Sequence, residues 1–178
     1  MKNILFIIFI SVFVFKSPIY SQNKTMDSLN LALKNAKHDT TRLRIYVALC
    51  EECELQDNLK YTEPALKLAN SLLQGLKNEK AKKSLLRKKA IFYSCRTAYY
   101  QQNGDSSNQR RWLFIELENY IQLNDTNEIF SKYLNISAYY FDYGNTPIAI
   151  KYFDKAIQFA KQMNNKKLVS YGNFQMGQ

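Results

Sequence analysis

Three cysteines and one histidine are the residues whose chemistry could serve a metal or redox site. Cys50 and Cys53 are separated by two positions, which is the spacing of a redox pair or of half a zinc site. No second Cys or His pair follows to supply two more zinc ligands. An odd count of three is also not the pattern of a disulfide scaffold. We therefore expect Cys50 and Cys53 to pack as small buried side chains, and we expect no metal ion and no other cofactor.

The patterns that indicate catalysis are missing from the sequence. His38 is the only histidine, and it stands in a turn without a positioned acid–base partner. Glu51, Glu52 and Glu54 are neighbours on one expected helix, so they are not two acids facing each other across a pocket. The chain has neither a glycine-rich phosphate loop nor a nucleophile elbow. We expect no catalytic residues within these 178 residues.

Positive charge is concentrated in one segment. The formal net charge is +10, and seven of the basic residues lie between Lys77 and Lys89. Lys80, Lys83 and Arg87 align on one face if this segment is a helix. Two interpretations stay open. The segment is either a solvated face whose long side chains cover apolar surface, or a basic patch that contacts anionic headgroups or an acidic partner.

Residues 1–21 have the pattern of a secretory signal peptide. A short polar start at Lys2 is followed by twelve residues, Ile4 to Phe15, that are apolar except for Ser11. Ser21 is a small residue before a plausible cleavage site. An uncleaved anchor helix is the alternative, but a bilayer-spanning helix needs about 20 apolar residues. We expect export to the periplasm or cell envelope, which makes nucleic acid the least expected partner.

The sequence predicts helices throughout, because the chain has only five glycines and three prolines and shows no long apolar alternation. Any binding surface should therefore be formed by helices. The segment 126–164 is the most regular. Gly144 is expected to close its first helix, and Thr146 with Pro147 is expected to start the second. The second helix carries a buried stripe at helical spacing. This stripe comprises Ala149, Phe153, Ala156, Ile157 and Ala160.

The same pattern recurs at a constant interval along the chain. Tyr93, Thr97, Tyr100 and Gly104 each precede, by 40 in the numbering, Tyr133, Ser137, Tyr140 and Gly144. We expect a capping helix at 25–37, repeats at 40–76, 79–123 and 126–164, and the start of a fourth repeat at 166–178. In the first repeat, Thr62 should begin the second helix. In the second repeat, Gln109 and Glu116 replace alanines, so its second helix should pack less closely. The chain stops within the fourth repeat's first helix, so we expect the polypeptide to continue.

From Thr40 to Gln178 the sequence resembles the tetratricopeptide repeat (TPR) family. The resemblance is strongest at Tyr133, Ile136, Ser137, Tyr140, Gly144, Ala149, Phe153 and Ala156. It implies an all-α fold, a right-handed superhelical solenoid of antiparallel helix pairs with about three repeats plus the start of a fourth. With its leader, the chain is also similar to the exported sensory regions of bacterial TPR-containing histidine kinases and related regulators.

The resemblance also implies a concave groove in which the first helices of the repeats bind partner peptides. The positions that map to this groove are Arg44, Glu51, Glu54, Ser94, Gln101, Leu134, Asn135, Phe141 and Asp142. Their mixture of charged, amide and aromatic side chains suits a peptide ligand. The alternative is that they are ordinary exposed residues of helix faces.

Three hypotheses for function follow. The first is an exported helical-repeat module that binds protein or peptide, as the sensing or scaffold part of a longer signalling protein. The second is a free-standing envelope protein whose basic face, at Lys80, Lys83 and Arg87, binds an anionic membrane or polyanion. The third is an enzyme whose catalytic domain follows Gln178.

Overall fold

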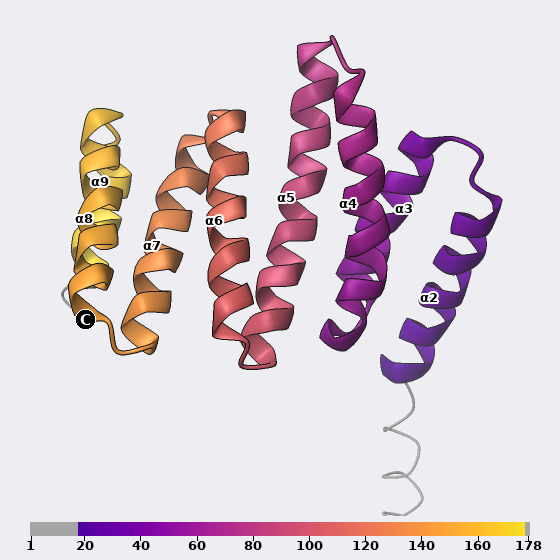
Figure 1. Ribbon diagram of the computed structural model, residues 1–178, viewed down its shortest axis with the longest axis horizontal. Helices are drawn as coiled ribbons and strands as arrows, with labels where there is room; N and C mark the ends of the chain where they lie inside the picture. The colour runs from indigo at the N-terminus through magenta and orange to yellow at the C-terminus, as the bar shows by residue number, and fades with distance from the viewer. Residues whose placement is uncertain (1–17, 177–178) are drawn as a thin grey trace, which may run out of the picture. The chain divides into compact units, whose positions relative to one another are not determined.

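The computed structural model describes residues 18–176 (Figure 1). Within this range every regular element is helical and there is no strand, so the all-α class is confirmed for this part of the chain. The α-helices are α2 (Pro18–Asn35), α3 (Asp39–Glu52), α4 (Asn58–Gln74), α5 (Glu79–Gln102), α6 (Ser106–Leu123), α7 (Thr126–Asp142), α8 (Thr146–Gln162) and α9 (Lys166–Met176). One turn of 3-10 helix, η1 (Leu55–Asp57), precedes α4.

The chain forms two compact units that divide after Cys53. The first contains α2 and α3, which pack against each other. Helix α2 begins at Pro18, before the expected capping helix at 25–37, so it includes the expected cleavage site at Ser21. The apolar run of the expected signal peptide lies outside the described residues. In α3 the residues Tyr46, Leu49 and Cys50 are buried.

The second unit contains η1 and helices α4 to α9. Each of these α-helices packs against the next along the chain, from α4 on α5 to α8 on α9 (Figure 1). The connections between consecutive helices are short, so neighbouring helices run antiparallel. This succession of adjacent helix pairs is the arrangement that a helical repeat requires.

The turns of the two central hairpins have the same geometry. Gly104 and Gly144, which are 40 apart in the numbering, have φ angles of 69° and 74°. A side chain disfavours this left-handed conformation, which explains why glycine ends α5 and α7. The backbone N–H after each glycine donates to a tyrosine carbonyl of the preceding helix, Asp105 to Tyr100 at 3.0 Å and Asn145 to Tyr140 at 2.7 Å.

The caps of α6 and α8 are supplied by the residues immediately before these helices. Asp105 Oδ1 accepts the backbone N–H of Asn108 at 3.0 Å, and Asn145 Oδ1 accepts that of Ile148 at 3.3 Å. Helix α8 begins at Thr146, as expected, but the side chain that caps it is that of Asn145 and not that of Thr146. Hydrogen bonds from the Asn108 side chain and backbone hold the pKa of Asp105 below its usual value.

Helix α4 begins at Asn58, a full turn before Thr62, where the sequence predicted its start. The reason is tertiary. Asn58, in the first turn, is buried and donates its Nδ2 to the Cys95 carbonyl of α5 at 3.4 Å. Thr62 is fully buried and accepts a hydrogen bond from Arg96. Pro64 therefore lies inside the helix, where it lacks the N–H that would reach the carbonyl of the preceding turn.

Apolar side chains between α6, α7 and α8 form the core around the central hairpins. One cluster consists of Leu113, Leu117, Ile129, Ile136 and Tyr139. A second, between α7 and α8, consists of Phe130, Ala156, Ile157 and Ala160. The expected alanines Ala149, Ala156 and Ala160 are all buried, which allows the helices to approach closely. Beside the first cluster the Tyr140 and Tyr152 rings stack at 5.8 Å, and burial, reinforced by Tyr140 and Tyr133, raises the pKa of Tyr152.

Helix α6 uses its polar residues inside the core, contrary to the expectation of looser packing. Gln109 and Glu116 are 6% and 1% exposed. Glu116 accepts a hydrogen bond from Ser94 of α5, and its Oε1 lies 2.6 Å from Lys132 Nζ of α7. The Tyr143 hydroxyl lies 3.2 Å from Gln109 Oε1. Each polar group thus has a partner on a neighbouring helix, which offsets the cost of burying it.

Candidate functional site

Helices α7, α8 and α9 enclose a pocket of about 840 Å³, named here the α7–α9 pocket. Phe130, Leu134, Ala138 and Phe141 recur at helical spacing along the side of α7 that faces it. Helix α8 contributes Ala149, Ile150 and Phe153, and α9 contributes Leu168 and Tyr171. The volume and apolar lining are those of a site that takes a side chain or short segment of a ligand.

Large apolar side chains surround the mouth of this pocket. Phe141, Ile150 and Tyr171 are 66%, 55% and 51% exposed. Deeper inside, Phe130 is 2% exposed, and its ring contacts that of Tyr171 at a centroid distance of 6.3 Å. Apolar side chains from three helices that stay in water around a concavity are unfavourable unless a ligand covers them.

Polar groups in the lining fix the pocket and offer hydrogen bonds. Ser137 Oγ donates to the Ala149 carbonyl at 2.7 Å, which ties α7 to the first turn of α8. Asn127, Asn135 and Thr146 add amide and hydroxyl groups. Asp142 is the charged residue of the lining, and it is exposed at the end of α7. The pocket thus combines an apolar floor with a negative charge at its rim.

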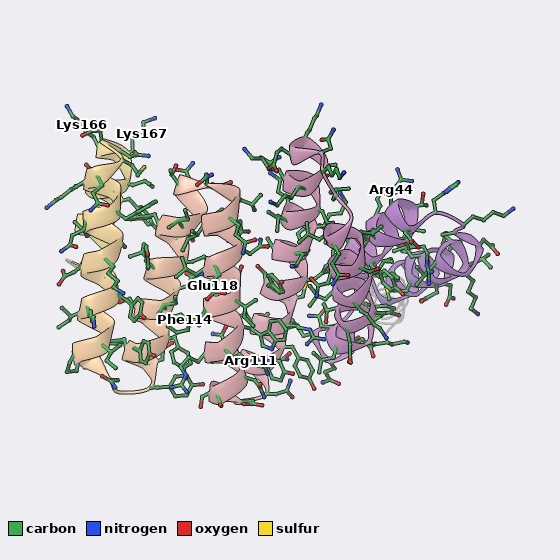
Figure 2. The ribbon with its side chains drawn as sticks, turned by 45° about the horizontal axis from the view of Figure 1, so that its top comes forward. Arg44, Arg111, Phe114, Glu118, Lys166 and Lys167 are labelled. Atoms are coloured by element: carbon green, nitrogen blue, oxygen red, sulfur yellow. The ribbon has the colours of Figure 1, made fainter. Side chains whose placement is uncertain are left out.

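The structure brings together four of the nine expected groove residues. Leu134, Asn135, Phe141 and Asp142 all line the α7–α9 pocket. Ser94 points into the fold instead, because its hydroxyl donates to Glu116. The other four are exposed but lie elsewhere. Gln101 is near the end of α5, Glu54 immediately precedes η1, and Arg44 (Figure 2) and Glu51 belong to α3 in the first unit.

Sequence reasoning missed several lining residues, among them Ile150, Leu168 and Tyr171. One signal could have identified Ile150. It lies one residue outside the stripe that begins at Ala149, on the exposed face that also carries Lys151, where an isoleucine has no packing role. Leu168 and Tyr171 gave no signal, because their contribution depends on where α9 meets α7 and α8.

The three residues of the expected basic patch lie along α5. Lys80, Lys83 and Arg87 are exposed, and none forms an ion pair in the part of the chain that the structure describes. Their neighbours are engaged. Lys82 lies 3.9 Å from Glu79, and Lys88 Nζ donates to Ser84 at 3.1 Å.

The three cysteines differ in burial: Cys53 and Cys95 are only half-buried, so the expectation of a buried side chain is wrong for Cys53. Cys50 is buried, and the Cys53 thiol points to the Cys50 carbonyl at 3.9 Å. Among residues 18–176, no group of three or more His, Cys, Asp or Glu side chains is arranged to hold a metal ion. In the same range, no helix combines the length and the apolar character that crossing a membrane requires.

Comparisons with known proteins do not add a family to this description. A scan of the sequence against protein-family models finds no match, and a search of the curated proteins also finds none. The function of the α7–α9 pocket must therefore be argued from its geometry and side-chain chemistry.

Proposed function

We propose that this chain is a non-catalytic helical-repeat module of the TPR kind, which binds a peptide segment of another protein in the α7–α9 pocket. The observation that carries the proposal is the ring of exposed apolar side chains, Phe141, Ile150 and Tyr171, around an 840 Å³ concavity. Burying large anchors in such pockets supplies most of the affinity in peptide recognition.

Repeated ring contacts support the repeat assignment. Tyr99 and Tyr100 meet edge to face at 5.2 Å and 85°, and Tyr139 and Tyr140 meet at 5.2 Å and 82°. Two further ring pairs at equivalent repeat positions have equal interplanar angles of 33°: Tyr93 with Trp112, and Tyr133 with Tyr152. Hairpins α5–α6 and α7–α8 thus repeat in side-chain detail, as units of a right-handed solenoid with about three repeats and the start of a fourth would.

The lining indicates what kind of peptide fits. Its apolar floor takes one or two aliphatic or aromatic side chains, while Asn127 and Asn135 can hydrogen-bond to an extended backbone. Asp142 favours a basic residue or an N-terminal amine beside them. The expected ligand is an apolar segment flanked by positive charge.

Selection of peptides from a random display library tests the proposal. Binding of the selected peptides would be measured by fluorescence polarisation against the unaltered protein and against Phe141→Ser and Ile150→Ser. Both side chains are mainly in water, so these changes leave the fold intact. We expect each to weaken binding about tenfold, which corresponds to about 1.4 kcal/mol per lost anchor.

Ile121→Ser is the matched control, because Ile121 is 47% exposed on α6 and outside the pocket. It should leave the affinity unchanged. If the selected peptides bind all three variants as tightly as the unaltered protein, the α7–α9 pocket is not the peptide site.

The leader supports a location outside the cytoplasm. We infer that the module is exported to the periplasm or cell envelope and serves as the sensing or scaffold part of a longer signalling protein, on the pattern of residues 1–21. Expression in a bacterial host with its own secretion system checks the location. Recovery of the chain in the periplasmic or membrane fraction is the expected result, and exclusive recovery in the cytoplasm contradicts it.

A second candidate function rests on the basic patch. Lys80, Lys83 and Arg87 present three exposed charges in line along α5, which suits an anionic membrane or another polyanion. In this case the protein binds vesicles that contain anionic lipid, and replacing the three residues with glutamine abolishes binding. Neutral vesicles are the control. Equal binding to both kinds of vesicle excludes this function.

A further inference from the structure

A second cavity, of about 420 Å³, lies between α4, α5 and α6 and shares no residue with the α7–α9 pocket. We name it the α4–α6 cleft. Leu66, Tyr93, Trp112 and Ile115 form its apolar part, and Glu63, Lys67, Asn70 and Arg96 form its polar part. Nothing in the proposed peptide binding uses this cleft, so its chemistry calls for a separate explanation.

Arg96 is held in one orientation at the centre of the cleft. Its guanidinium carbon lies 4.6 Å from the centroid of the Trp112 ring, within the range of a cation–π contact. Its Nε donates to Thr62 Oγ1 at 3.1 Å, and Thr62 is fully buried. The Tyr93 ring supports the indole at 5.7 Å. The hydrogen bond to Thr62 uses only Nε, so the two terminal nitrogens of the guanidinium can donate to a ligand.

Positive charge in and around the cleft exceeds negative charge. Arg96 forms no ion pair with a carboxylate of residues 18–176. Lys67 is a second cation of the lining, and Glu63 is its single anion. Arg111 adds a third cation, with its guanidinium carbon 5.9 Å from the Trp112 ring, and Figure 2 shows it on α6. The unpaired guanidinium therefore sits in a field that attracts an anion.

The equivalent place in the next hairpin is filled. Tyr152, the repeat equivalent of Trp112, packs edge to face on Phe114 at 5.7 Å and stacks on Tyr140 at 5.8 Å. Ile136 stands there in place of Arg96 and is fully buried. The oriented arginine of the α4–α6 cleft is therefore not reproduced at the equivalent positions of hairpin α7–α8.

We propose that the α4–α6 cleft binds the side-chain carboxylate of an acidic peptide segment. The planar guanidinium of Arg96 matches a carboxylate with two parallel hydrogen bonds, and Lys67 contributes a further charge. The methylene groups of a glutamate side chain pack on Trp112 and Leu66. A carboxylate fits better than a phosphate, because its single charge is repelled less by Glu63.

Trp112 is the only tryptophan in the chain, so its fluorescence reports directly on the cleft. The test is a titration with a blocked tetraglutamate peptide, and its matched control is the tetraglutamine peptide of the same length. We expect a saturable change in Trp112 emission with tetraglutamate, no change with tetraglutamine, and weaker binding as salt is raised.

Charge-matched variants separate the cleft from the general charge of the protein. Arg96→Gln should weaken tetraglutamate binding at least tenfold. Arg110→Gln removes one positive charge from an exposed position of α6 outside the cleft and should leave binding within twofold. Lys67 is exposed, so Lys67→Gln should fold normally, and it should weaken tetraglutamate binding severalfold. This variant tests the cleft if Arg96→Gln fails to fold.

Three results would overturn the assignment. They are equal responses to the two peptides, equal weakening by Arg96→Gln and Arg110→Gln, and a response to inorganic phosphate as strong as that to tetraglutamate. Because the α4–α6 cleft and the α7–α9 pocket share no residue, Phe141→Ser should leave tetraglutamate binding intact. The two proposals can therefore fail independently.

Discussion

The buried ion pair between α6 and α7 allows the sharpest prediction about stability. The side chains of Glu116 and Lys132 are only 2% and 11% exposed, and their charged atoms are 2.6 Å apart. Ser94 donates a further hydrogen bond to Glu116, and Lys132 Nζ lies 5.5 Å from the Tyr120 ring. We predict that Lys132→Met is strongly destabilising, whereas Lys132→Met combined with Glu116→Leu is tolerated.

The magnitudes follow from the geometry. At 2.6 Å the attraction between the two charges is about 6 kcal/mol for an effective dielectric constant of about 20. Removing each ion from water costs several kcal/mol, so the intact pair is close to neutral overall. Loss of Lys132 leaves the Glu116 carboxylate desolvated and without its cation, which should cost about 3–5 kcal/mol. Glu116→Leu should cost less, because Lys132 is the more exposed partner and its flexible stem can reach water.

Urea denaturation followed by far-ultraviolet circular dichroism measures these differences as free energies of unfolding. The exposed pair of Lys82 and Glu79, at 3.9 Å, is the control, and Lys82→Met should change the free energy of unfolding by less than about 1 kcal/mol. The double variant at positions 116 and 132 should lie within about 2 kcal/mol of the unaltered protein.

Two outcomes would refute this reasoning. One is a cost below about 1 kcal/mol for Lys132→Met, which would mean that Glu116 reaches water in solution. The other is a double variant as unstable as Lys132→Met alone, which would mean that the pair is worth far more than its desolvation cost.

Three further predictions concern single positions. Burial, reinforced by neighbouring carboxylates, raises the pKa of Tyr120 from 10.0 to about 12. The protonated tyrosine therefore contributes its full stability below pH 10, and this contribution is lost as the pH rises toward 12. In urea titrations, the drop in the free energy of unfolding between pH 9 and pH 11 should be smaller for Tyr120→Phe than for the unaltered protein by about 1 kcal/mol, after allowance for partial exposure. Gly144→Ala should cost about 1 kcal/mol in the same assay because φ is 74°, whereas Gly75→Ala, at a φ of −98°, should be neutral or stabilising. At Gly172 an added Cβ would meet Ile157 Cδ1 at 2.2 Å, so Gly172→Ala should lower the melting temperature, and Ile157→Val, which removes that methyl, should restore part of the loss.

The expected hairpins agree with the structure where local chemistry decides. Gly104 and Gly144 end α5 and α7, and the alanines from Ala149 to Ala160 are buried, because glycine conformation and helical periodicity act within a few residues. The start of α4 was missed because Asn58 is tied by a hydrogen bond to Cys95 of α5, which is distant in the sequence. Pattern reasoning near Pro64 could not include that contact.

In the candidate site, too, local sequence predicts some residues and tertiary packing decides the others. The resemblance to tetratricopeptide repeats assigned Leu134, Asn135, Phe141 and Asp142 to a groove, and these four line the α7–α9 pocket. It cannot tell which exposed positions of α8 and α9 face them, so Ile150 and Tyr171 were not predicted. Ser94 was also expected in the groove, yet its hydroxyl donates a hydrogen bond to the buried carboxylate of Glu116.

Local sequence was sufficient to establish that the described chain is helical and where its central hairpins turn, since backbone conformation and capping depend on neighbouring residues. The roles of the polar residues on those helices came from packing alone. Glu116 is a core residue because Ser94 and Lys132 lie beside it, whereas Arg96 borders an open cleft beside Trp112. A charge is stable or unstable inside a protein according to partners that are distant in sequence, and those partners meet only when the helices pack.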